Sequence, residues 1–414
     1  MTELCYHRNN CRLCGSDHLT RVLELTPTPP ANAFVSEADK DTAQTCFPLD
    51  VYFCQACAHL QLLDVVNPSV LFENYVYVSG TSPVFVQHFE DYAENLIGRF
   101  DHLEKGRVLD IGSNDGTLLK AFKKRGMTVL GIDPAKDIAK QATDDGIPTI
   151  ADFFNKDRAA EILKQHGPMQ CITANNVFAH GDDLQGIVNG VKVLLDDQGV
   201  FVFEVSYALD VYEKTLFDTI YHEHLAYHSL KPLQRFFERN GLRFISAKRV
   251  ASHGGSLRGI VARKNSDHAR DNSAPDLIAL EHKTGIDKAE TWAAFGAKIN
   301  QIKSQLMEIL EKAKDHDKTI AAFGAPAKAT TLMYHFGLGP DTIDFIIDDS
   351  PLKQGLYSPG MHIPVLSSRA IDDKKPDMIV ILAWNFAETI IGNHQDFLNA
   401  GGQFVVPLPT VEIV

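Results

Sequence analysis

Ionisable and aromatic side chains crowd the stretch Tyr221-His-Glu-His-Leu-Ala-Tyr-His228, which holds three histidines, one glutamate and two tyrosines. A neutral imidazole accepts a proton near neutral pH, and an adjacent carboxylate can increase its basicity. If the stretch is helical, Tyr221, His224 and His228 share one face. If it is a loop, Glu223 and His224 are neighbours. We expect general-base chemistry with His224 as the base.

Two other interpretations of this histidine-rich stretch stay open. One is a zinc site, because His224 and His228 have the spacing of a metal-binding pair. However, the order His-Glu-His at residues 222–224 breaks the H-E-x-x-H arrangement of metalloproteases. The other is a surface helix without chemistry. The residue types favour the base over both.

A short apolar run that breaks into a loop rich in glycine, Arg107-Val-Leu-Asp-Ile-Gly-Ser-Asn-Asp-Gly116, predicts a strand, a tight turn and a helix. Gly112 and Gly116 accept positive φ and let the backbone approach a ligand, and Asn114 tolerates the left-handed region. The next strand ends at Asp133, at the distance where a first βαβ unit places a carboxylate on a ribose. The pair predicts a nucleoside pocket, with an ordinary strand–turn–helix as the alternative.

The charge of this loop indicates which nucleoside it binds. The G-x-G-x-x-G pattern is absent, and Asp110 and Asp115 would repel a pyrophosphate at the helix N-terminus. A cationic ligand with an amine suits these carboxylates. The form Asp-x-Gly-x-Asn-Asp-Gly resembles motif I of class I S-adenosylmethionine (SAM) methyltransferases, which implies SAM as the cofactor. The expected SAM contacts in this region are Asp110, Gly112, Asn114, Gly116 and Asp133.

Two further segments are expected near the cofactor. After the third βα step we expect Asp152 to bond the exocyclic amine of adenine and Phe153 to stack on the ring; the alternative places Phe153 and Phe154 in the core. The segment Ala174–His180 follows the next strand and faces the carboxyl edge of the sheet, where open α/β sheets bind ligands. We expect Asn176 of this segment to contact the cofactor and His180 to contact the substrate.

Two cysteine pairs near the N-terminus, Cys11-Arg-Leu-Cys14 and Cys54-Gln-Ala-Cys57, are separated by 39 residues. Together they supply four thiolates, a complete tetrahedral zinc site with no open position for catalysis. A redox role would need one such pair in a thioredoxin-like context, which is absent. We predict structural zinc that folds a small segment. The remaining cysteines, expected to be unligated, are Cys5, Cys46 and Cys171.

Length and composition limit the class of protein. A chain of 414 residues with 44% hydrophobic and 22% charged residues predicts a soluble protein of two or three domains. The net charge of −13 argues against nonspecific nucleic-acid binding. Apolar runs are too short to span a membrane, and residues 1–6 lack a signal-peptide core. We expect a cytoplasmic monomer without membrane or nucleic-acid partners.

The chemistry-bearing residues must be positioned by an α/β fold. From residue 82 to about 261, strands and helices alternate, which predicts a mostly parallel sheet. An amphipathic helix over Lys288–Lys314 joins this part to a second Rossmann-like half. The predicted strands are Arg107–Ile111, Thr128–Ile132, Cys171–Ala174, Gly199–Val205, Leu242–Arg249, Ser256–Ala262, Thr342–Asp348 and Asp377–Leu382. The predicted domains are a zinc-binding segment at 1–70, a methyltransferase domain at 71–285 and a C-terminal Rossmann-like domain at 286–414.

Substrate contacts are expected in two further places. In Phe323-Gly-Ala-Pro-Ala-Lys-Ala329, a helix N-terminus together with Lys328 could hold a diphosphate, with a solvated helix residue as the alternative. Tyr75 and Tyr77 share one face if their segment is a strand, and that face is either core or a substrate lid.

The order of these parts resembles the sugar C-methyltransferases, the NDP-hexose 3-C-methyltransferases of deoxysugar pathways. The resemblance rests on the cysteine pairs, the motif I loop, Tyr-x-Glu-His, His253-Gly-Gly-Ser256 and the segment Phe323–Ala329. It implies a three-part build and a nucleotide-diphosphate keto-deoxysugar as the substrate, with His253 among its contacts. It also implies that Tyr221, Glu223 and His224 lie at the active centre.

The sequence therefore predicts a SAM-dependent transfer of a methyl group to carbon. A sugar 4-ketone makes the C3 proton acidic enough for His224 to remove, and Tyr221 would stabilise the enolate oxygen without a metal. One alternative is methylation of a sugar oxygen or nitrogen, which needs a base but no ketone. Another is a zinc-ribbon protein that senses nucleotides without catalysis.

Overall fold

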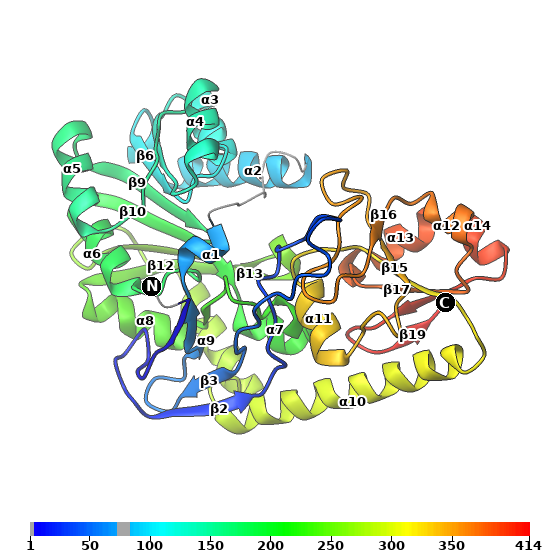
Figure 1. The fold of residues 1–414 in the computed structure, drawn as a ribbon. Helices are drawn as coiled ribbons and strands as arrows, with labels where there is room; N and C mark the ends of the chain where they lie inside the picture. The colour runs from blue at the N-terminus through cyan, green and yellow to red at the C-terminus, as the bar shows by residue number, and fades with distance from the viewer. Residues whose placement is uncertain (1–3, 73–82) are drawn as a thin grey trace.

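The N-terminal part is a small β structure in the computed structural model, which describes residues 4–72 and 83–414 (Figure 1). Strands β2, β3 and β4 pair antiparallel, and the free edge of β4 is taken by β11 (Ala226–Tyr227) from the middle of the chain. A two-residue strand from the histidine-rich stretch thus completes the N-terminal sheet. The elements of this part are β1 (Cys5–His7), β2 (Leu19–Leu23), β3 (Val51–Cys54), β4 (Leu60–Leu62), β5 (Asp64–Val66) and α1 (Pro68–Phe72).

The middle part is a seven-stranded sheet with the order β12-β13-β10-β9-β6-β7-β8. The strands from β8 to β10 are parallel, and β13 is antiparallel to β10 and β12. The strand order reverses at β6, and open α/β sheets bind ligands beyond the carboxyl ends of the strands at such a point, here β6 and β9. The strands are β6 (Arg107–Ile111), β7 (Thr128–Ile132), β8 (Thr149–Ile150), β9 (Met169–Asn175), β10 (Leu195–Ser206), β12 (Leu242–Val250) and β13 (Ser256–Arg263).

Helices cover both faces of this sheet. Along β10, Val200 and Val202 face the cluster under α2 and α3, whereas Phe201 and Phe203 face the opposite cluster. This alternation follows from the two-residue period of a strand, and burial on both faces explains the continuous apolar run. The helices are α2 (Pro83–Arg99), η2 (Asp101–Leu103), α3 (Thr117–Lys124), α4 (Lys136–Asp144), α5 (Lys156–His166), α6 (Leu184–Leu194), α7 (Ala208–Glu213), η3 (Phe217–Thr219), α8 (Leu230–Arg239), η4 (Ser252–Gly254) and α9 (Ser273–Thr284).

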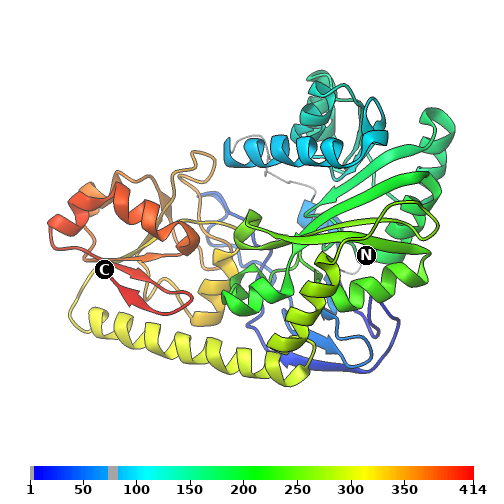
Figure 2. The ribbon, with the colours of Figure 1, turned by 180° about the vertical axis from the view of Figure 1, so that it is seen from behind.

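The long helix α10 (Ala289–Lys314) confirms the predicted amphipathic connection, because its apolar positions at three- and four-residue steps are buried. It packs on β2 at one end and on β14 at the other, and so spans the N-terminal and C-terminal parts along one side of the molecule (Figure 2).

The C-terminal part is a second, six-stranded sheet with the order β16-β15-β14-β17-β18-β19. All of its pairs are parallel except β18 with β19, and the order reverses at β14. The predicted second Rossmann-like half is confirmed. Its elements are β14 (Ile320–Phe323), α11 (Ala329–Phe336), β15 (Phe345–Ile347), β16 (Val365–Leu366), α12 (Ala370–Lys374), β17 (Met378–Ile381), η5 (Trp384–Phe386), α13 (Ala387–Asn393), α14 (Gln395–Asn399), β18 (Gln403–Val406) and β19 (Glu412–Ile413).

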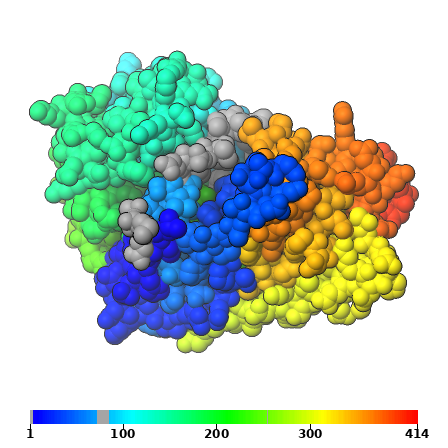
Figure 3. All heavy atoms as spheres, in the orientation of Figure 1, coloured from blue at the N-terminus to red at the C-terminus, as the bar shows by residue number. Residues whose placement is uncertain are grey.

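The predicted α/β class is confirmed, and each predicted strand has a counterpart, with β6 and β7 matching residue for residue. The strand predicted at Thr342–Asp348 is shorter than expected, because only Phe345–Ile347 pairs in the sheet. The boundaries at residues 70 and 285 stay predictions. Figure 3 shows the N-terminal part lying against both the middle and the C-terminal parts. Across residues 4–72 and 83–414, each helix is too short or too polar to cross a membrane.

Candidate functional site

The loop after β6 has the backbone that its glycines predict. Gly112 and Gly116 have φ of 67° and 73°, and Asn114 has φ of 50°. A Cβ at Gly112 would lie 2.3 Å from Cγ2 of Val177, which follows β9. The loops after β6 and β9 therefore touch at the point where the strand order reverses, and a side chain at position 112 would separate them.

The Asp133 carboxylate is held by two backbone N–H groups. Its Oδ2 accepts from the N–H of Asn114 and its Oδ1 from the N–H of Ala135, each at 2.9 Å. Burial raises the pKa of Asp133, and these two hydrogen bonds oppose that shift. The carboxylate is thereby oriented at the end of β7 with acceptor capacity left for ribose hydroxyls.

Asp110, in β6, is buried. Burial raises its pKa to about 7, although its Oδ1 accepts a hydrogen bond of 2.6 Å from the Thr173 hydroxyl. A cation nearby would favour the ionised form. This donor and acceptor set fits SAM, which carries an ammonium and a sulfonium group.

Asp152 and Phe153 follow β8, the edge strand of the seven-stranded sheet. Asp152 forms an ion pair with Arg158, and this hydrogen bond lowers the pKa of Asp152. Phe153 is 54% exposed, whereas Phe154 packs against the core. Of the two phenylalanines, Phe153 is therefore the one whose side chain is exposed to solvent. Asn176 follows β9 with φ of 55° and donates its backbone N–H to Glu204 O at 2.8 Å.

Residues 221–225 form a turn that leads into β11, so the helical alternative is wrong. The Nδ1 of His224 lies 2.8 Å from the carbonyl oxygen of Thr219. A carbonyl can only accept, so Nδ1 carries the hydrogen and Nε2 of the neutral ring keeps its lone pair. The Tyr221 and His180 rings lie 4.1 and 5.0 Å from the His224 ring, centroid to centroid. The structure thus brings three of the predicted site residues together.

The other two histidines of the stretch are buried elsewhere. His222 Nε2 lies 3.2 Å from the carbonyl oxygens of Phe47 and Pro48. The His228 ring stacks on Phe178, and burial lowers the pKa of His228 to about 4. Among the described residues, the four N-terminal cysteines are the one group of three or more possible ligands that lie close enough to share a metal.

Glu223 faces the N-terminal part. Its side chain is buried, its Oε1 lies 3.4 Å from Asn32 Nδ2, and burial raises the pKa of Glu223 to about 7. The carboxyl group therefore titrates near neutrality. Thr219, rather than Glu223, occupies the Nδ1 side of His224.

The C-terminal part contacts the residues just before Tyr221. The hydroxyl of Thr331 donates to Ile220 O at 2.6 Å, and the indole of Trp384 donates to Asp218 Oδ2 at 2.7 Å. Lys328 lies 3.4 Å from the same carboxylate oxygen, and its side chain is 14% exposed. The solvated alternative for Lys328 is therefore wrong.

Of the remaining predicted substrate contacts, His253 belongs to the turn η4, which also holds Gly254. Gly254 has φ of 87°, and a Cβ there would lie 3.2 Å from Asn385 Nδ2 of the C-terminal part. The His253 backbone therefore lies where the two sheets face each other. Tyr75 and Tyr77 fall outside the described residues.

The four cysteine sulfurs converge as predicted, all within 4.8 Å of one another. Cys11 and Cys57 Sγ are 3.6 Å apart, and Cys14 and Cys54 Sγ are 3.5 Å apart. Tetrahedral zinc with Zn–S bonds near 2.3 Å needs sulfurs about 3.8 Å apart, so the set fits structural zinc. Cys5, Cys46 and Cys171 stand apart from this group.

Sequence reasoning missed the residues that hold the site from a distance. Thr219 acts through a backbone carbonyl, and Asn32, Thr331 and Trp384 reach the segment 217–224 from other parts of the chain. Their types and spacing carried no signal, because each contact depends on how the parts pack.

Three family models match successive parts of the chain. The family described as "Putative zinc binding domain" matches residues 11–72, "Methyltransferase domain" matches 86–247, and "C-methyltransferase C-terminal domain" matches 251–409. With the seven-stranded sheet and the four converging cysteines, these matches define a class I SAM-dependent methyltransferase with a zinc-binding N-terminal domain.

The particular family follows from a full-length relative. C-methyltransferase NovU from Streptomyces niveus is 34% identical over 414 residues, which cover 100% of this chain and 99% of that protein. The chain belongs to this C-methyltransferase family.

Solved methyltransferase structures overlap with part of the chain. Magnesium protoporphyrin IX methyltransferase from Synechocystis PCC 6803 with bound SAM has a TM-score of 0.33 and 14% identity, covering 43% of this chain and 79% of that one. A methyltransferase from Burkholderia thailandensis with bound S-adenosylhomocysteine has a TM-score of 0.33 and 16% identity, covering 44% and 78%. The family assignment rests on the full-length relative.

Proposed function

We propose that this C-methyltransferase acts on C3 of a nucleotide-diphosphate 4-keto-deoxyhexose, with His224 as the base. The observation that carries the proposal is the hydrogen bond from His224 Nδ1 to Thr219 O, which places the proton of the neutral ring on Nδ1 and so makes Nε2 the basic nitrogen. The rings of Tyr221 and His180 stand beside it.

In this mechanism Nε2 of His224 removes the C3 proton, which the neighbouring ketone makes acidic. The C–H electrons move into an enolate, and the Tyr221 hydroxyl donates a hydrogen bond to the developing oxyanion. SAM, when bound, supplies an electrophilic methyl group. The enolate carbon would take this methyl: the C–C bond forms from the enolate electrons and the ketone is restored, while the S–CH3 bond breaks and its electron pair stays on sulfur as S-adenosylhomocysteine. His224 retains the proton until it is released to water.

The same proposal gives the outer residues their roles. Asp110, Asp133 and Asn176 would bind the cofactor at the ends of β6, β7 and β9. Lys328 of the C-terminal part and the η4 turn with His253, between β12 and β13 of the first sheet, would contact the nucleotide diphosphate. Glu223, whose pKa burial raises to about 7, would hold a sugar hydroxyl or pass on a proton.

The test is to incubate the full chain with SAM and a panel of dTDP- and UDP-linked 4-keto-deoxyhexoses. Mass spectrometry would detect methyl addition, and NMR of the product would locate the new methyl. A methyl on C3 supports the proposal. A methyl on oxygen or nitrogen would replace it with the corresponding alternative.

A further inference from the structure

The loop after β9, residues 176–183, contacts both the SAM loop and the histidine-rich stretch. Val177 packs against Gly112 of the SAM loop, and the His180 ring lies beside His224. The carbonyl of Ala179 accepts the backbone N–H of Ala226, the first residue of β11. A shift of this loop would therefore move His180 relative to His224.

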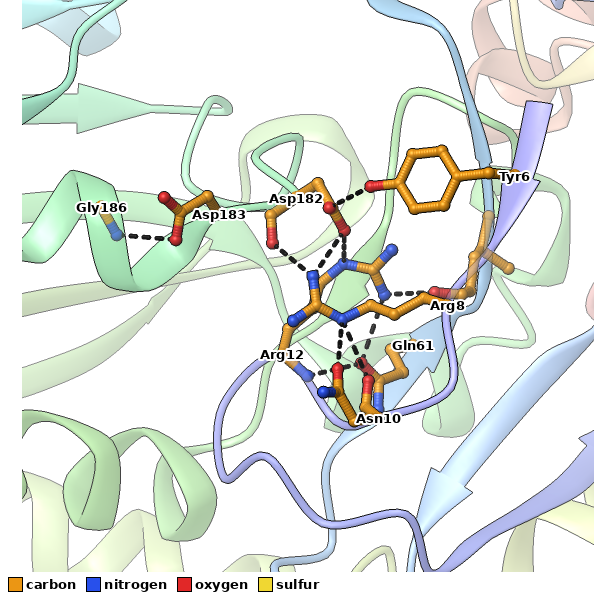
Figure 4. Close-up of polar contacts among 9 residues, drawn as sticks. Tyr6, Arg8, Asn10, Arg12, Gln61, Asp182, Asp183 and Gly186 are labelled. Carbon is orange, nitrogen blue, oxygen red and sulfur yellow. Dashed lines mark hydrogen bonds and ion pairs between the residues drawn. The ribbon is translucent and has the colours of Figure 1, made fainter. Parts of the chain in front are cut away.

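The N-terminal part anchors this loop at Asp182. Figure 4 shows Tyr6, Arg8 and Arg12 pointing toward the Asp182 carboxylate. Arg8 Nη1 donates to Asp182 Oδ1 at 2.9 Å and to its backbone oxygen at 3.1 Å, and the Tyr6 hydroxyl donates to Oδ2. Arg12 Nε forms an ion pair with Oδ1 at 3.0 Å. Three side chains thus converge on one carboxylate, two residues beyond His180.

Arg12 lies between Cys11 and Cys14, so its place depends on the first cysteine pair. Its backbone N–H and its Nη1 donate to Gln61 Oε1 at 3.1 and 3.2 Å, and Nη1 also donates to Leu62 O. Gln61 in turn is the strand partner of Ala226. The side chain of Arg12 is fully buried, which fixes its direction toward Asp182.

Stability alone gives a weak reason for such an arrangement. A buried ion pair roughly offsets the cost of removing both charges from water, and well-packed apolar residues often stabilise a fold as much. A buried guanidinium does restrict geometry, because its planar set of N–H donors can bond acceptors only at certain positions. The arrangement is therefore suited to placing the loop.

We propose that Arg12 and Asp182 are positioning residues, through which the zinc-binding cysteine pair holds His180 beside His224. Neither residue touches the reacting atoms. The inference rests on the proposed function, because His180 matters only if it works beside His224.

Arg12→Lys is the sharpest test. It keeps the charge but loses the Nε contact and the fork that reaches Gln61 and Leu62. The matched control is Arg21→Lys, since Arg21 pairs with Asp50 at 3.1 Å within the N-terminal part. Zinc content and the unfolding midpoint would be measured for each variant, together with kcat on the sugar nucleotide that the wild type methylates. NMR of isotope-labelled histidine would follow His180, assigned by loss of its signal in His180→Gln.

With zinc content and midpoint preserved, Arg12→Lys should shift the His180 signal and lower kcat by about tenfold to a hundredfold, as a displaced catalytic group does. Arg21→Lys should change neither. An unchanged His180 signal and kcat in zinc-loaded Arg12→Lys would overturn the proposal.

If Arg12→Lys loses zinc or folds poorly, Asp182→Asn carries the same test, because it leaves the cysteine pair intact. If Asp182→Asn also fails to fold, the contact is purely structural and the proposal is overturned. If no sugar nucleotide is turned over by the wild type, the proposed substrate has failed, and the His180 signal alone decides the positioning role.

Discussion

The ammonium of Lys328 lies 3.4 Å from the buried carboxylate of Asp218, three residues before Tyr221. Burial raises the pKa of Asp218, and the charge of Lys328 opposes that shift. Lys328 also lies 4.5 Å above the Trp384 ring. One cation of the C-terminal part therefore holds the segment that carries the candidate base.

Lys328→Met should raise KM for the sugar nucleotide by about tenfold to a hundredfold, the range of one charged hydrogen bond of about 1.5–3 kcal/mol. KM for SAM should stay unchanged, because the cofactor loop lies in the other sheet. Steady-state kinetics with each substrate varied in turn would measure both. Lys312→Met, on an exposed pair with Glu308, is the control. Equal increases in KM for both substrates would point to a structural role for Lys328.

Asp133→Ala should weaken SAM binding by about 1.5–3 kcal/mol, because the carboxylate is oriented by two N–H groups toward the expected ribose position. Calorimetry with SAM would measure the change. Asp144→Ala, at an exposed pair with Lys140, should leave the affinity unchanged. Unchanged affinity in Asp133→Ala would remove Asp133 from the cofactor site.

Cys54→Ser should lower zinc content and folded yield together, because three thiolates and a hydroxyl bind zinc less well than four thiolates. Activity should fall with them, since β4 of the same sheet pairs with β11. Metal analysis and thermal unfolding would follow both. Cys46→Ser, at an exposed cysteine outside the group, is the control. Wild-type protein that loses its zinc but keeps stability and activity would contradict a structural zinc.

The free energy of unfolding should depend on pH through His228. The pKa of His228 lies at about 4 in the fold, because burial lowers it, against about 6.5 in the unfolded chain. The unfolded chain therefore binds the extra proton, so stability is complete above pH 6.5 and declines as pH falls toward 4.

The slope in that window should approach about 1.4 kcal/mol per pH unit for this group. His59 stacks on His228, and burial lowers its pKa as well, so it adds to the slope. Denaturant unfolding at several pH values would show a flatter profile for His228→Phe. The exposed-site variant His18→Gln should keep the wild-type profile. If the free energy of unfolding of His228→Phe keeps the wild-type slope with pH, His228 is not the source of that pH dependence.

The sequence predicted the elements better than the contacts between them. The strands Arg107–Ile111 and Thr128–Ile132 are apolar runs bounded by turn residues, and such local patterns determine their limits. β11 is two residues long, too short for any period to reveal it, and it pairs with a strand about 165 residues earlier. The pairs of Asp182 with Arg12 and of Asp218 with Lys328 are likewise products of packing.

For the histidine-rich stretch, the residue types indicated the chemistry but not its geometry. Helix and turn were both compatible with the spacing of Tyr221 and His224. The deciding contact is made by a backbone carbonyl, Thr219 O, and every residue has one. Residue identity therefore could not show which group orients the base.

If His224 removes a carbon-bound proton, deuterium at C3 of the keto-sugar should exchange with water in the presence of S-adenosylhomocysteine, without methyl transfer. Enolate formation needs the base and the ketone but no methyl donor, provided that the site closes around the product cofactor. NMR of the sugar would measure the exchange. His224→Ala should lose exchange and methylation together, by roughly 10²–10⁴-fold.

Tyr221→Phe should lose less methylation activity than His224→Ala if the tyrosine stabilises the oxyanion together with another donor. His166→Ala, at the exposed end of α5, controls for the loss of a histidine elsewhere on the fold. Methylation that survives in His224→Ala would transfer the role of base to His180, whose ring lies 5.0 Å away, since His222 and His228 are buried against other partners. Methylation without any exchange in the wild type would mean either that proton removal and methyl transfer occur in one step, or that His224 returns its proton to C3 before the proton reaches water.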